Sequence, residues 1–322
     1  TAAGSVAQLP ATLPAAVLVV QHFAPQSNGQ FLVDRLARHT TLACQLATHG
    51  SPLEAGTLYL APPDRHLLAK DGSQAHVLVT TGPQENNYRP AADALFRSAA
   101  VAYGPAVVGV VLTGMLHDGT AGLEFIKRCG GVAVVQDPRE AEFPSMPETA
   151  LRAVNVDYVV PLRLMGPLLD EIVRGTVPEA PGGIPQDLKL EAAIAERIVG
   201  TTEAVAQLGR LVPLTCPDCG GTLWEMTHGR VQRYRCHTGH AFTAEVLLDR
   251  SQQALEESLW VALRMLEERK NLLLGMAARG EAASLVPSDQ RIEELKKHVN
   301  RLREFLLNPN GRANPTEATP AE

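Results

Sequence analysis

The stretch Ala106–Gly122, AVVGVVLTGMLHDGTAG, decides the fold. Its run Val107–Val111, rich in β-branched residues, is typical of a strand buried on both faces of a parallel sheet. A glycine-flanked segment with Asp118 follows, and a helix is expected from Thr120. An acidic residue at the carboxyl end of a parallel strand lies at the edge where open α/β sheets bind ligands. The same residue also fits a simpler role as N-cap of that helix, and this stretch alone leaves both roles open.

Segments of strand and helix character alternate on both sides of this stretch. Short apolar runs predict strands at Ala16–His22, Thr57–Ala61, His76–Thr81, Ala106–Thr113, Gly131–Gln136 and Tyr158–Pro161. Helical spacing of apolar residues predicts helices at Phe31–Arg38, Pro90–Tyr103, Ala121–Cys129, Pro147–Ala153 and Leu162–Val173. This alternation predicts an α/β domain over residues 1–175, with a doubly wound, mostly parallel sheet covered by helices on both faces.

Four further segments follow this domain. Residues 176–213 open with TVPEAPGGIPQ and are expected to form a linker with a short helix. Residues 214–243 contain a compact group of cysteines and histidines. Residues 244–307 show apolar residues at heptad-like steps, which predicts an α-helical hairpin that buries its seam internally or by self-association; a plain amphipathic pair without a partner fits the pattern equally. Residues 308–322 lack an apolar pattern and are predicted to be disordered.

Composition narrows the class of protein. The 322 residues carry a formal net charge of −6 and no long basic run, so neither nucleic acid nor an anionic membrane is the expected partner. No apolar stretch is long enough for insertion into a membrane, and the first residues lack the pattern of a signal peptide. Three of the five cysteines cluster at the spacing of metal ligands. These features indicate a cytoplasmic protein.

His22 and Asp118 form a candidate catalytic pair. His22 ends the first predicted strand, and Asp118 follows a later one. Because parallel strands of one sheet end at the same edge, both side chains are expected at one rim. A histidine held by an aspartate is the orienting half of a Ser-His-Asp triad. A lone histidine at a strand end is also compatible with a purely structural hydrogen bond.

Five motifs give this part of the chain a specific likeness. VVQHFAP, YLAPPDRHL, RPAADALF, VVLTGMLHDGTAG and VVQDPREAEFPSMPETAL, in that order, resemble the catalytic domain of CheB-type protein-glutamate methylesterases. The resemblance implies a doubly wound α/β domain with a Ser-His-Asp mechanism. It implies hydrolysis of glutamate methyl esters on methyl-accepting chemoreceptors, with deamidation of glutamine in some members.

The resemblance also assigns roles to individual residues. By motif position, His22 matches the family's histidine and Asp118 its aspartate. Met115 matches the methionine whose backbone N–H helps to hold the oxyanion, and Arg89 matches a position near the rim where substrate binds. Nothing in the chain resembles a phosphoacceptor receiver domain.

The family's nucleophile has no counterpart in this sequence. It lies in a Gly-x-Ser-x-Gly-Gly turn, which in the family precedes a helix and a Leu-Pro pair, here Leu9-Pro10. Ser5 falls within that helix and does not match. The turn and the strand before it would therefore lie upstream of Thr1, so the chain is a fragment, has a misassigned start, or lacks the nucleophile. As written, it is predicted to be destabilised and to have no esterase activity.

The second chemical motif is Cys216-Pro-Asp-Cys219, followed by Cys236-His-Thr-Gly-His240. Two residues between the first cysteines is the spacing of a zinc-ribbon knuckle, and the gap to Cys236 fits such modules. The expected ligands of a structural Zn²⁺ are Cys216, Cys219, Cys236 and His240, with His228 a weaker candidate for the fourth position. The arrangement resembles the C-terminal extension of some receiver-less CheB-like proteins.

Two functions remain in view. The leading interpretation is a methylesterase fused to a zinc ribbon and a helical hairpin. The alternative is a non-enzymatic signalling adaptor that uses the α/β domain, the ribbon and the hairpin to bind proteins. A Gly-x-Ser-x-Gly-Gly turn encoded in frame upstream of Thr1 favours the enzyme, and its absence favours the adaptor. The acidic charge balance disfavours a nucleic-acid-binding ribbon.

Overall fold

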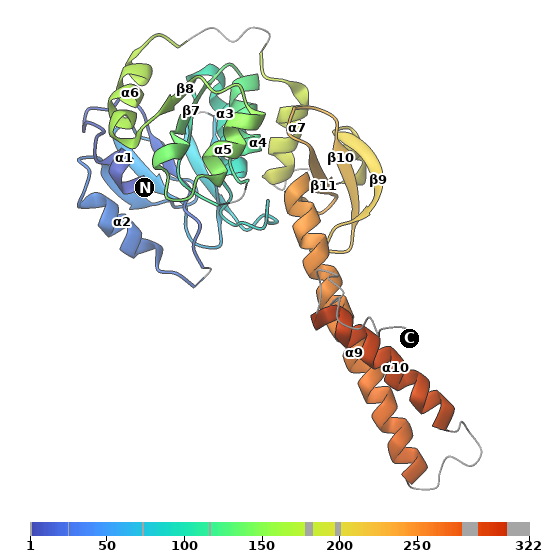
Figure 1. The fold of residues 1–322 in the computed structure, drawn as a ribbon. Coiled ribbons are helices and arrows are strands. Elements are labelled where there is room, and N and C mark those ends of the chain that lie inside the picture. Colours follow the sequence, from blue (N-terminus) through green and yellow to red (C-terminus); the bar gives the residue numbers. More distant parts are fainter. Residues whose placement is uncertain are drawn as a thin grey trace, which may run out of the picture. The chain divides into compact units, whose positions relative to one another are not determined.

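A computed structural model describes residues 2–24, 26–72, 74–115, 117–177, 183–196, 201–278 and 289–307 (Figure 1). The chain divides into two compact units, Thr1–Leu247 and Leu248–Glu322. None of the described helices is both long enough and apolar enough to cross a membrane.

Parallel strands form the frame of the first unit. They form two three-stranded sheets, which are β1 (Val17–Val19), β3 (Thr57–Leu60) and β2 (Ala43–Leu46), and then β6 (Val108–Val111), β7 (Val132–Gln136) and β8 (Tyr158–Val160). The central strand β3 is buried at every residue, as expected when helices cover both faces of a parallel sheet. The α/β fold class predicted from the sequence is confirmed.

Helices cover these strands through their apolar faces (Figure 1). They are α1 (Ala2–Val6), α2 (Gly29–Ala37), α3 (Ala92–Tyr103), α4 (Thr120–Arg128), α5 (Ser145–Ala153) and α6 (Leu162–Arg174). Helices α4 and α5 pack on β6 and β7, and α3 packs on α4. Leu123, Phe125 and Ile126 of α4 are fully excluded from solvent in the main apolar core. Helix α4 is thereby fixed behind the loop that carries Asp118.

Two strands, β2 and β4 (His66–Lys70), are not predicted from the sequence. Strand β4 pairs antiparallel with β5 (His76–Thr80) instead of joining a parallel sheet. Strand β2 is half exposed, with the sequence ACQL, so it lacks the apolar run of a buried strand. Strands β1 and β6 each stand at the end of their sheet, and among the described residues no strand pairs with their outer edges. The strand expected upstream of Thr1 stays a prediction.

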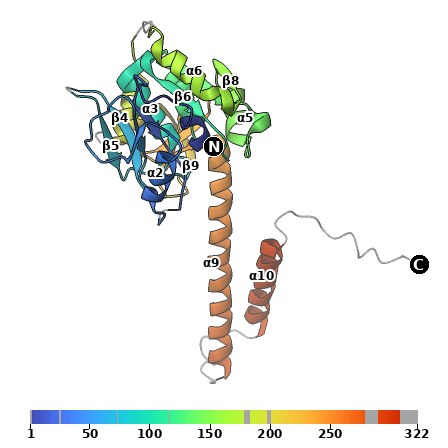
Figure 2. The same ribbon diagram turned by 90° about the vertical axis from the view of Figure 1, so that its left-hand side faces the viewer.

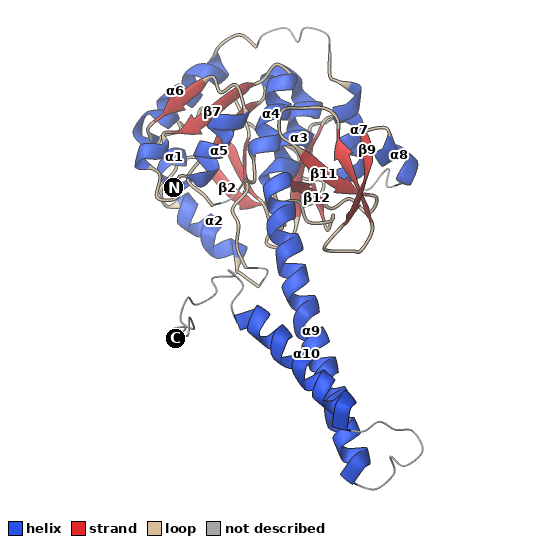
Figure 3. Ribbon diagram, turned by 45° about the vertical axis from the view of Figure 1, so that its right-hand side comes forward, coloured by secondary structure: helices blue, strands red, loops and turns tan. Residues whose placement is uncertain are grey.

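A four-stranded antiparallel sheet follows, in the order β12-β11-β10-β9 (Figure 3). Its strands are β9 (Gly209–Thr215), β10 (Thr222–Met226), β11 (Arg233–Cys236) and β12 (Ala241–Thr243), preceded by α7 (Gln186–Ala195) and α8 (Thr202–Ala206). Strand β9 begins at Gly209, within the segment predicted to be a linker. It is an edge strand with mostly exposed side chains, so its sequence carries little apolar signal.

Five buried charges join this antiparallel sheet to the α/β region. We call them the ion cluster; its members are Glu85, Arg97, Glu191, Arg233 and Arg235, all at most 6% exposed. Both terminal guanidinium nitrogens of Arg97, Nη1 and Nη2, donate to the Glu85 carboxylate. Those of Arg233 donate to Glu191 over 2.8 Å each. Arg235 lies 3.5 Å from Glu85 and 3.8 Å from Glu191.

The arginines keep both carboxyl groups of the ion cluster charged. Burial by itself raises the pKa of a carboxyl group, but the attraction of Arg97 and Arg235 outweighs it and holds the pKa of Glu85 far below its usual range. Against the same burial, Arg233 holds the pKa of Glu191 at about 2. The Arg233 guanidinium also stacks 4.5 Å from the ring centroid of Phe125 in α4. Strand β11 belongs to the four-stranded antiparallel sheet, which we call the ribbon. Its arginine side chains are therefore buried in one interior together with residues of the α/β region.

The second unit is a helical hairpin of α9 (Ala244–Ala278) and α10 (Asp289–Leu307) (Figure 2). Leu263 and Val299 are buried, and Arg303 pairs with Glu267 over 2.8 Å. The predicted helices are confirmed. Leu255, one of the apolar residues in the heptad-like pattern of α9, is exposed. Self-association stays a prediction, and the tail predicted to be disordered lies outside the described residues.

We expect Arg233→Ala to lower the free energy of unfolding by about 3 kcal/mol, because it removes both hydrogen bonds and the nearest charge partner of the buried Glu191. Arg210→Ala is the matched control. Arg210 also pairs with a glutamate of the same sheet, Glu225, but its side chain is 76% exposed. Urea unfolding should show no change for the control. Equal effects of the two substitutions would contradict the role of the ion cluster.

Candidate active site and metal centre

The structure brings His22 and Asp118 together. Nε2 of His22 lies 2.7 Å from Oδ2 of Asp118. His22 follows β1 and Asp118 follows β6, so the pair joins the carboxyl ends of two parallel strands, as the sequence predicts. The Asp118 side chain is fully buried, whereas that of His22 is 26% exposed. The imidazole therefore remains accessible from solvent.

Helix α3 holds the Asp118 carboxylate. Its first-turn backbone N–H groups donate to this carboxylate, that of Ala92 over 2.6 Å and that of Asp93 over 3.1 Å. The alternative prediction, that Asp118 is the N-cap of the following helix α4, is wrong. The N-cap of α4 is Gly119, with φ +89°, and no side chain caps that end. Asp118 instead caps α3 from outside. The positive end of the helix dipole favours a carboxylate there.

This carboxylate decides the tautomer of His22. An ionised carboxylate only accepts hydrogen bonds, so Nε2 of His22 carries the proton. Nδ1 is left as the basic nitrogen. Among the described residues, no hydroxyl or thiol group contacts it. The Tyr88 ring stacks on the imidazole, with centroids 3.8 Å apart and planes at 7°. The ring can therefore neither tilt freely nor turn away.

A pocket of about 200 Å³ opens beside His22. His22, Phe23, Asp64, Tyr88, Arg89 and Pro90 line it, with two neighbours. Arg89 donates two hydrogen bonds to Asp64 Oδ1, over 2.9 and 2.7 Å, and one to the Gly82 carbonyl. Arg89 thus lies at the rim, as expected, but most of its donors have partners within the chain. Its part in substrate binding stays a prediction.

In the loop after β6, the backbone N–H of Met115 is available as a hydrogen-bond donor. Thr113 N donates to the buried Gln136 Oε1 over 2.9 Å, and Gly114 N donates to the Phe143 carbonyl over 2.9 Å. Met146 N in turn donates to the Gly114 carbonyl. These bonds hold Thr113 and Gly114, the two residues before Met115, while the N–H of Met115 has no hydrogen-bond partner among the described residues. A free donor in a fixed loop is what an oxyanion site requires.

Asp93 is a buried acid that the sequence analysis did not single out. It lies beside Asp118 and accepts hydrogen bonds from Gly122 N over 2.6 Å and from Asn86 Nδ2 over 2.8 Å. Burial, and then the charge of Asp118, raise the pKa of Asp93 to about 8. Asp93 is therefore mostly protonated at neutral pH. The carboxylate that faces His22 then has no second full charge beside it.

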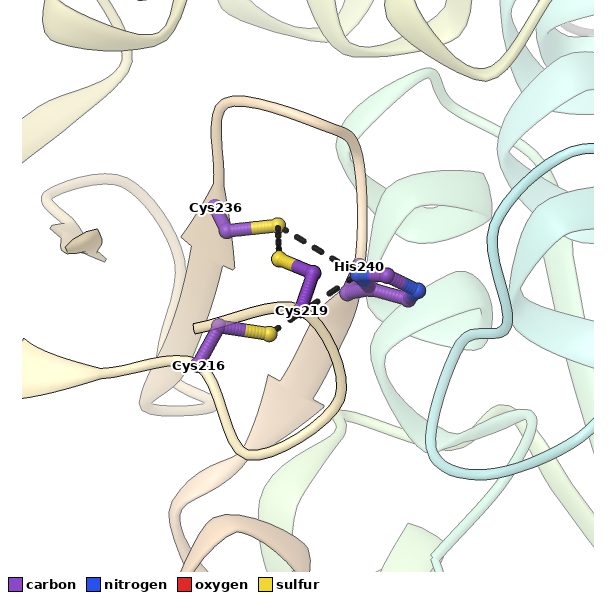
Figure 4. A group of neighbouring side chains, drawn as sticks. All are labelled: Cys216, Cys219, Cys236 and His240. Carbon is purple, nitrogen blue, oxygen red and sulfur yellow. Dashed lines mark hydrogen bonds between the residues drawn. The ribbon is translucent and has the colours of Figure 1, made fainter. Parts of the chain in front are cut away.

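The four expected metal ligands converge (Figure 4). One ligand atom from each of Cys216, Cys219, Cys236 and His240 lies within 4.8 Å of all the others. Nδ1 of His240 is 3.7 Å from Cys216 Sγ and 3.5 Å from Cys236 Sγ, and Cys219 Sγ is 3.7 Å from Cys236 Sγ. Ligands of a tetrahedral zinc ion lie about 3.5–3.8 Å apart, given its usual bond lengths. The donor set and its spacing fit such an ion.

The backbone of the ribbon aims these ligands. Cys216 N donates to the Gly221 carbonyl, and Cys236 N to the His240 carbonyl, which closes one turn around each half of the group. His237 does not join the ligands: a Cβ at Gly221 would lie 2.7 Å from its Cε1, so His237 packs on that glycine. His228, the weaker candidate, is also not part of the four-residue group.

The structure thus combines an α/β fold with a histidine–aspartate contact at the carboxyl ends of its strands. Residues 4–169, about half of the chain, match the family model CheB methylesterase. The chain therefore belongs to the CheB methylesterase family.

Relatives and a solved structure agree with this membership. A protein-glutamate methylesterase/protein-glutamine glutaminase of Methanosarcina mazei is 37% identical over 174 residues, which are 52% of this chain and 47% of the relative. One of a Nocardioides species is 39% identical over 170 residues, 52% of this chain and 45% of the relative. The chain thus spans about half the length of such relatives. The crystal structure of the Thermotoga maritima CheB methylesterase catalytic domain superposes with a TM-score of 0.52 at 31% identity, over 53% of this chain and 91% of that domain.

Asp93→Asn should flatten the pH dependence of stability. A raised pKa in the folded state means that its stabilisation is fully present below the unfolded pKa of about 4 and is lost as pH rises through about 8. Asparagine cannot ionise, so the free energy of unfolding should fall less between pH 5 and pH 8 than in the parent chain. Urea unfolding at four pH values measures this. Asp34→Asn, at an exposed position, should keep the parent slope; the same slope in the Asp93 variant contradicts the assignment.

Proposed function

We propose that this chain is the catalytic part of a protein-glutamate methylesterase that acts on chemoreceptors or related signalling proteins in the cytoplasm. The observation that carries the proposal is the 2.7 Å contact between His22 and the buried Asp118. The names of the relatives give the reaction: a glutamate methyl ester is hydrolysed, or a glutamine is deamidated.

In this mechanism His22 is the base. Asp118 accepts the Nε2–H, so Nδ1 takes the proton of a serine hydroxyl as the serine oxygen attacks the ester carbonyl. The Met115 N–H donates to the oxyanion, a contribution of about 3 kcal/mol per donor. His22 then protonates the departing methanol. A water molecule, deprotonated by the same nitrogen, releases glutamate from the acyl-enzyme.

The serine is the part that residues 1–322 do not supply. They contain no Gly-x-Ser-x-Gly-Gly sequence. The chain as given is therefore expected to be inactive, and a chain extended upstream by a segment with this turn is expected to be active. A non-enzymatic adaptor is the competing function, and it predicts no hydrolysis by either chain.

Hydrolysis of a methylated receptor peptide, followed as methanol release, tests the proposal with the extended chain. His22→Ala should lower kcat at least about a thousandfold, because it removes the base. Asp118→Asn should also lower kcat strongly, because it no longer fixes the tautomer. His39→Ala, on the exposed surface, should leave kcat unchanged. Turnover that survives loss of His22 overturns the mechanism.

We further propose that Cys216, Cys219, Cys236 and His240 bind one structural Zn²⁺. Four protein ligands leave no open position for chemistry, so the ion would hold the ribbon together. Elemental analysis should find about one zinc ion per chain. Cys216→Ser should lose the ion, whereas Cys44→Ser, at a free cysteine outside the group, should retain it. Full zinc content in the Cys216 variant would exclude this site.

A further inference from the structure

The strand that follows the metal ligand His240 docks on the active-site loop. Strand β12 lies against the turn Glu85–Tyr88 of the α/β region. Asn86 N donates to the Ala241 carbonyl over 2.8 Å, and Thr243 N donates to Asn86 Oδ1 over 2.9 Å. The last ligand of the metal group and the first docked residue are thus neighbours in sequence. A change in the ribbon reaches the turn without any intervening flexible segment.

The same turn presents Tyr88 to His22. Glu85 and Tyr88 exchange two backbone hydrogen bonds, and the two residues between them, Asn86 and Asn87, have φ of +49° and +70°. Positive φ at both central positions is the geometry of a type I′ turn, which asparagine and glycine favour. Tyr88 leaves this tight turn directly onto the imidazole. The position of the turn therefore sets the position of the ring that stacks on His22.

Asn86 also connects the ribbon with the carboxylates behind His22. Its Nδ2 donates to Asp93 Oδ2 over 2.8 Å, while its Oδ1 accepts from β12. Asp93 N in turn donates to Asp118. Asn86 is 4% exposed, so neither bond is readily replaced by water. The Asn86 side chain thus connects the ribbon to Asp93, whose backbone N–H donates to Asp118.

The ion cluster fixes the other end of this contact. Glu85 is the first residue of the turn. Its carboxylate accepts hydrogen bonds from both terminal guanidinium nitrogens of Arg97 and lies 3.5 Å from the guanidinium of Arg235 in β11. Glu124 of α4 accepts hydrogen bonds from the backbone N–H groups of Arg230 and Val231 in the ribbon. Displacing the ribbon would take Arg235 from Glu85 and both backbone donors from Glu124, which is unfavourable for buried carboxylates.

We propose that Asn86 is a positioning residue through which the metal-bound ribbon holds Tyr88 against His22, so that loss of the metal releases the catalytic histidine from its stack. This rests on the proposed function for the roles of His22 and of the metal. The ribbon is then part of the esterase site, because a bound metal ion keeps the Tyr88 ring stacked on His22 and thereby limits the motion of the His22 imidazole.

The test uses the full chain and the NMR signals of the His22 ring. A stacked aromatic ring shifts these signals upfield, and a purely structural role of the ribbon elsewhere would not move them. Removing zinc with a chelator should return the His22 signals toward their unstacked positions. Hydrogen exchange in residues 84–90 should rise about tenfold, the effect of losing one or two hydrogen bonds. Signals of Leu58 and Leu60 in β3 report whether the α/β core remains folded.

Two variants distinguish the effect of the turn's backbone conformation from that of the Asn86 side-chain hydrogen bonds to the ribbon and to Asp93. Asn86→Gly keeps the left-handed backbone and removes both side-chain hydrogen bonds, so it should release the stack even with zinc bound. Asn87→Gly is the control, because glycine suits that turn position and the Asn87 side-chain oxygen has no partner among the described residues. It should leave the His22 signals unchanged.

The outcomes divide cleanly. Unchanged His22 signals in Asn86→Gly, or in protein from which zinc has been removed, overturn this inference while leaving the proposed esterase intact. A chain that never binds zinc overturns the proposed metal site and the metal dependence with it. Release of the stack in the Asn86 variant and in zinc-free protein, with β3 signals retained, supports the inference regardless of whether the chain hydrolyses esters.

Discussion

The buried carboxylate of Asp118 is the contact on which the site depends. It takes one hydrogen bond from His22 and two from the first turn of α3, and it is fully excluded from solvent. A buried charge of this kind persists only when its partners are in place. Helix α3, strand β1 and the loop after β6 are therefore held in one arrangement by the same group. The raised pKa of Asp93 keeps a second negative charge away from it.

The ion cluster likewise holds separate segments together through buried charges. Arg97 lies in α3, so the helix that Asp118 caps also holds Glu85, which in turn lies 3.5 Å from Arg235 of the ribbon. Such pairs contribute little to net stability when compared with well-packed apolar residues. Removing one partner, however, is strongly unfavourable. The cluster thus specifies how the ribbon sits on the α/β region more than it increases stability.

The sequence predicted the parts of the site whose signal is local. His22, Asp118 and the Cys216 group each stand in a short motif, and the structure brings each set together at bonding distances. Buried strands such as β3 and β7 were predicted because apolar runs mark them. Strand β2, half exposed, carries no such run.

The contacts between distant segments could not be predicted in this way. Glu85, Glu191 and Arg235 are charged residues, which usually lie on solvated surfaces. Only the packing of four separate segments shows that they are buried together. Asn86 and Asn87 could have been recognised as a type I′ turn, because two consecutive asparagines favour positive φ. Their contact with β12 spans more than 150 residues, and no local pattern encodes it.

The residue at which the family match ends is therefore not the residue at which the compact unit ends. The match ends at residue 169, whereas Glu191 and Arg233 lie beyond it and complete the interior around Arg97. A fragment cut at the end of the match would display Glu85 and Arg97 on a new surface. Relatives that lack a ribbon need another way to cover these two positions, by different side chains or by a different neighbour. In this chain the segment after residue 169 supplies buried charges to the interior of the α/β region.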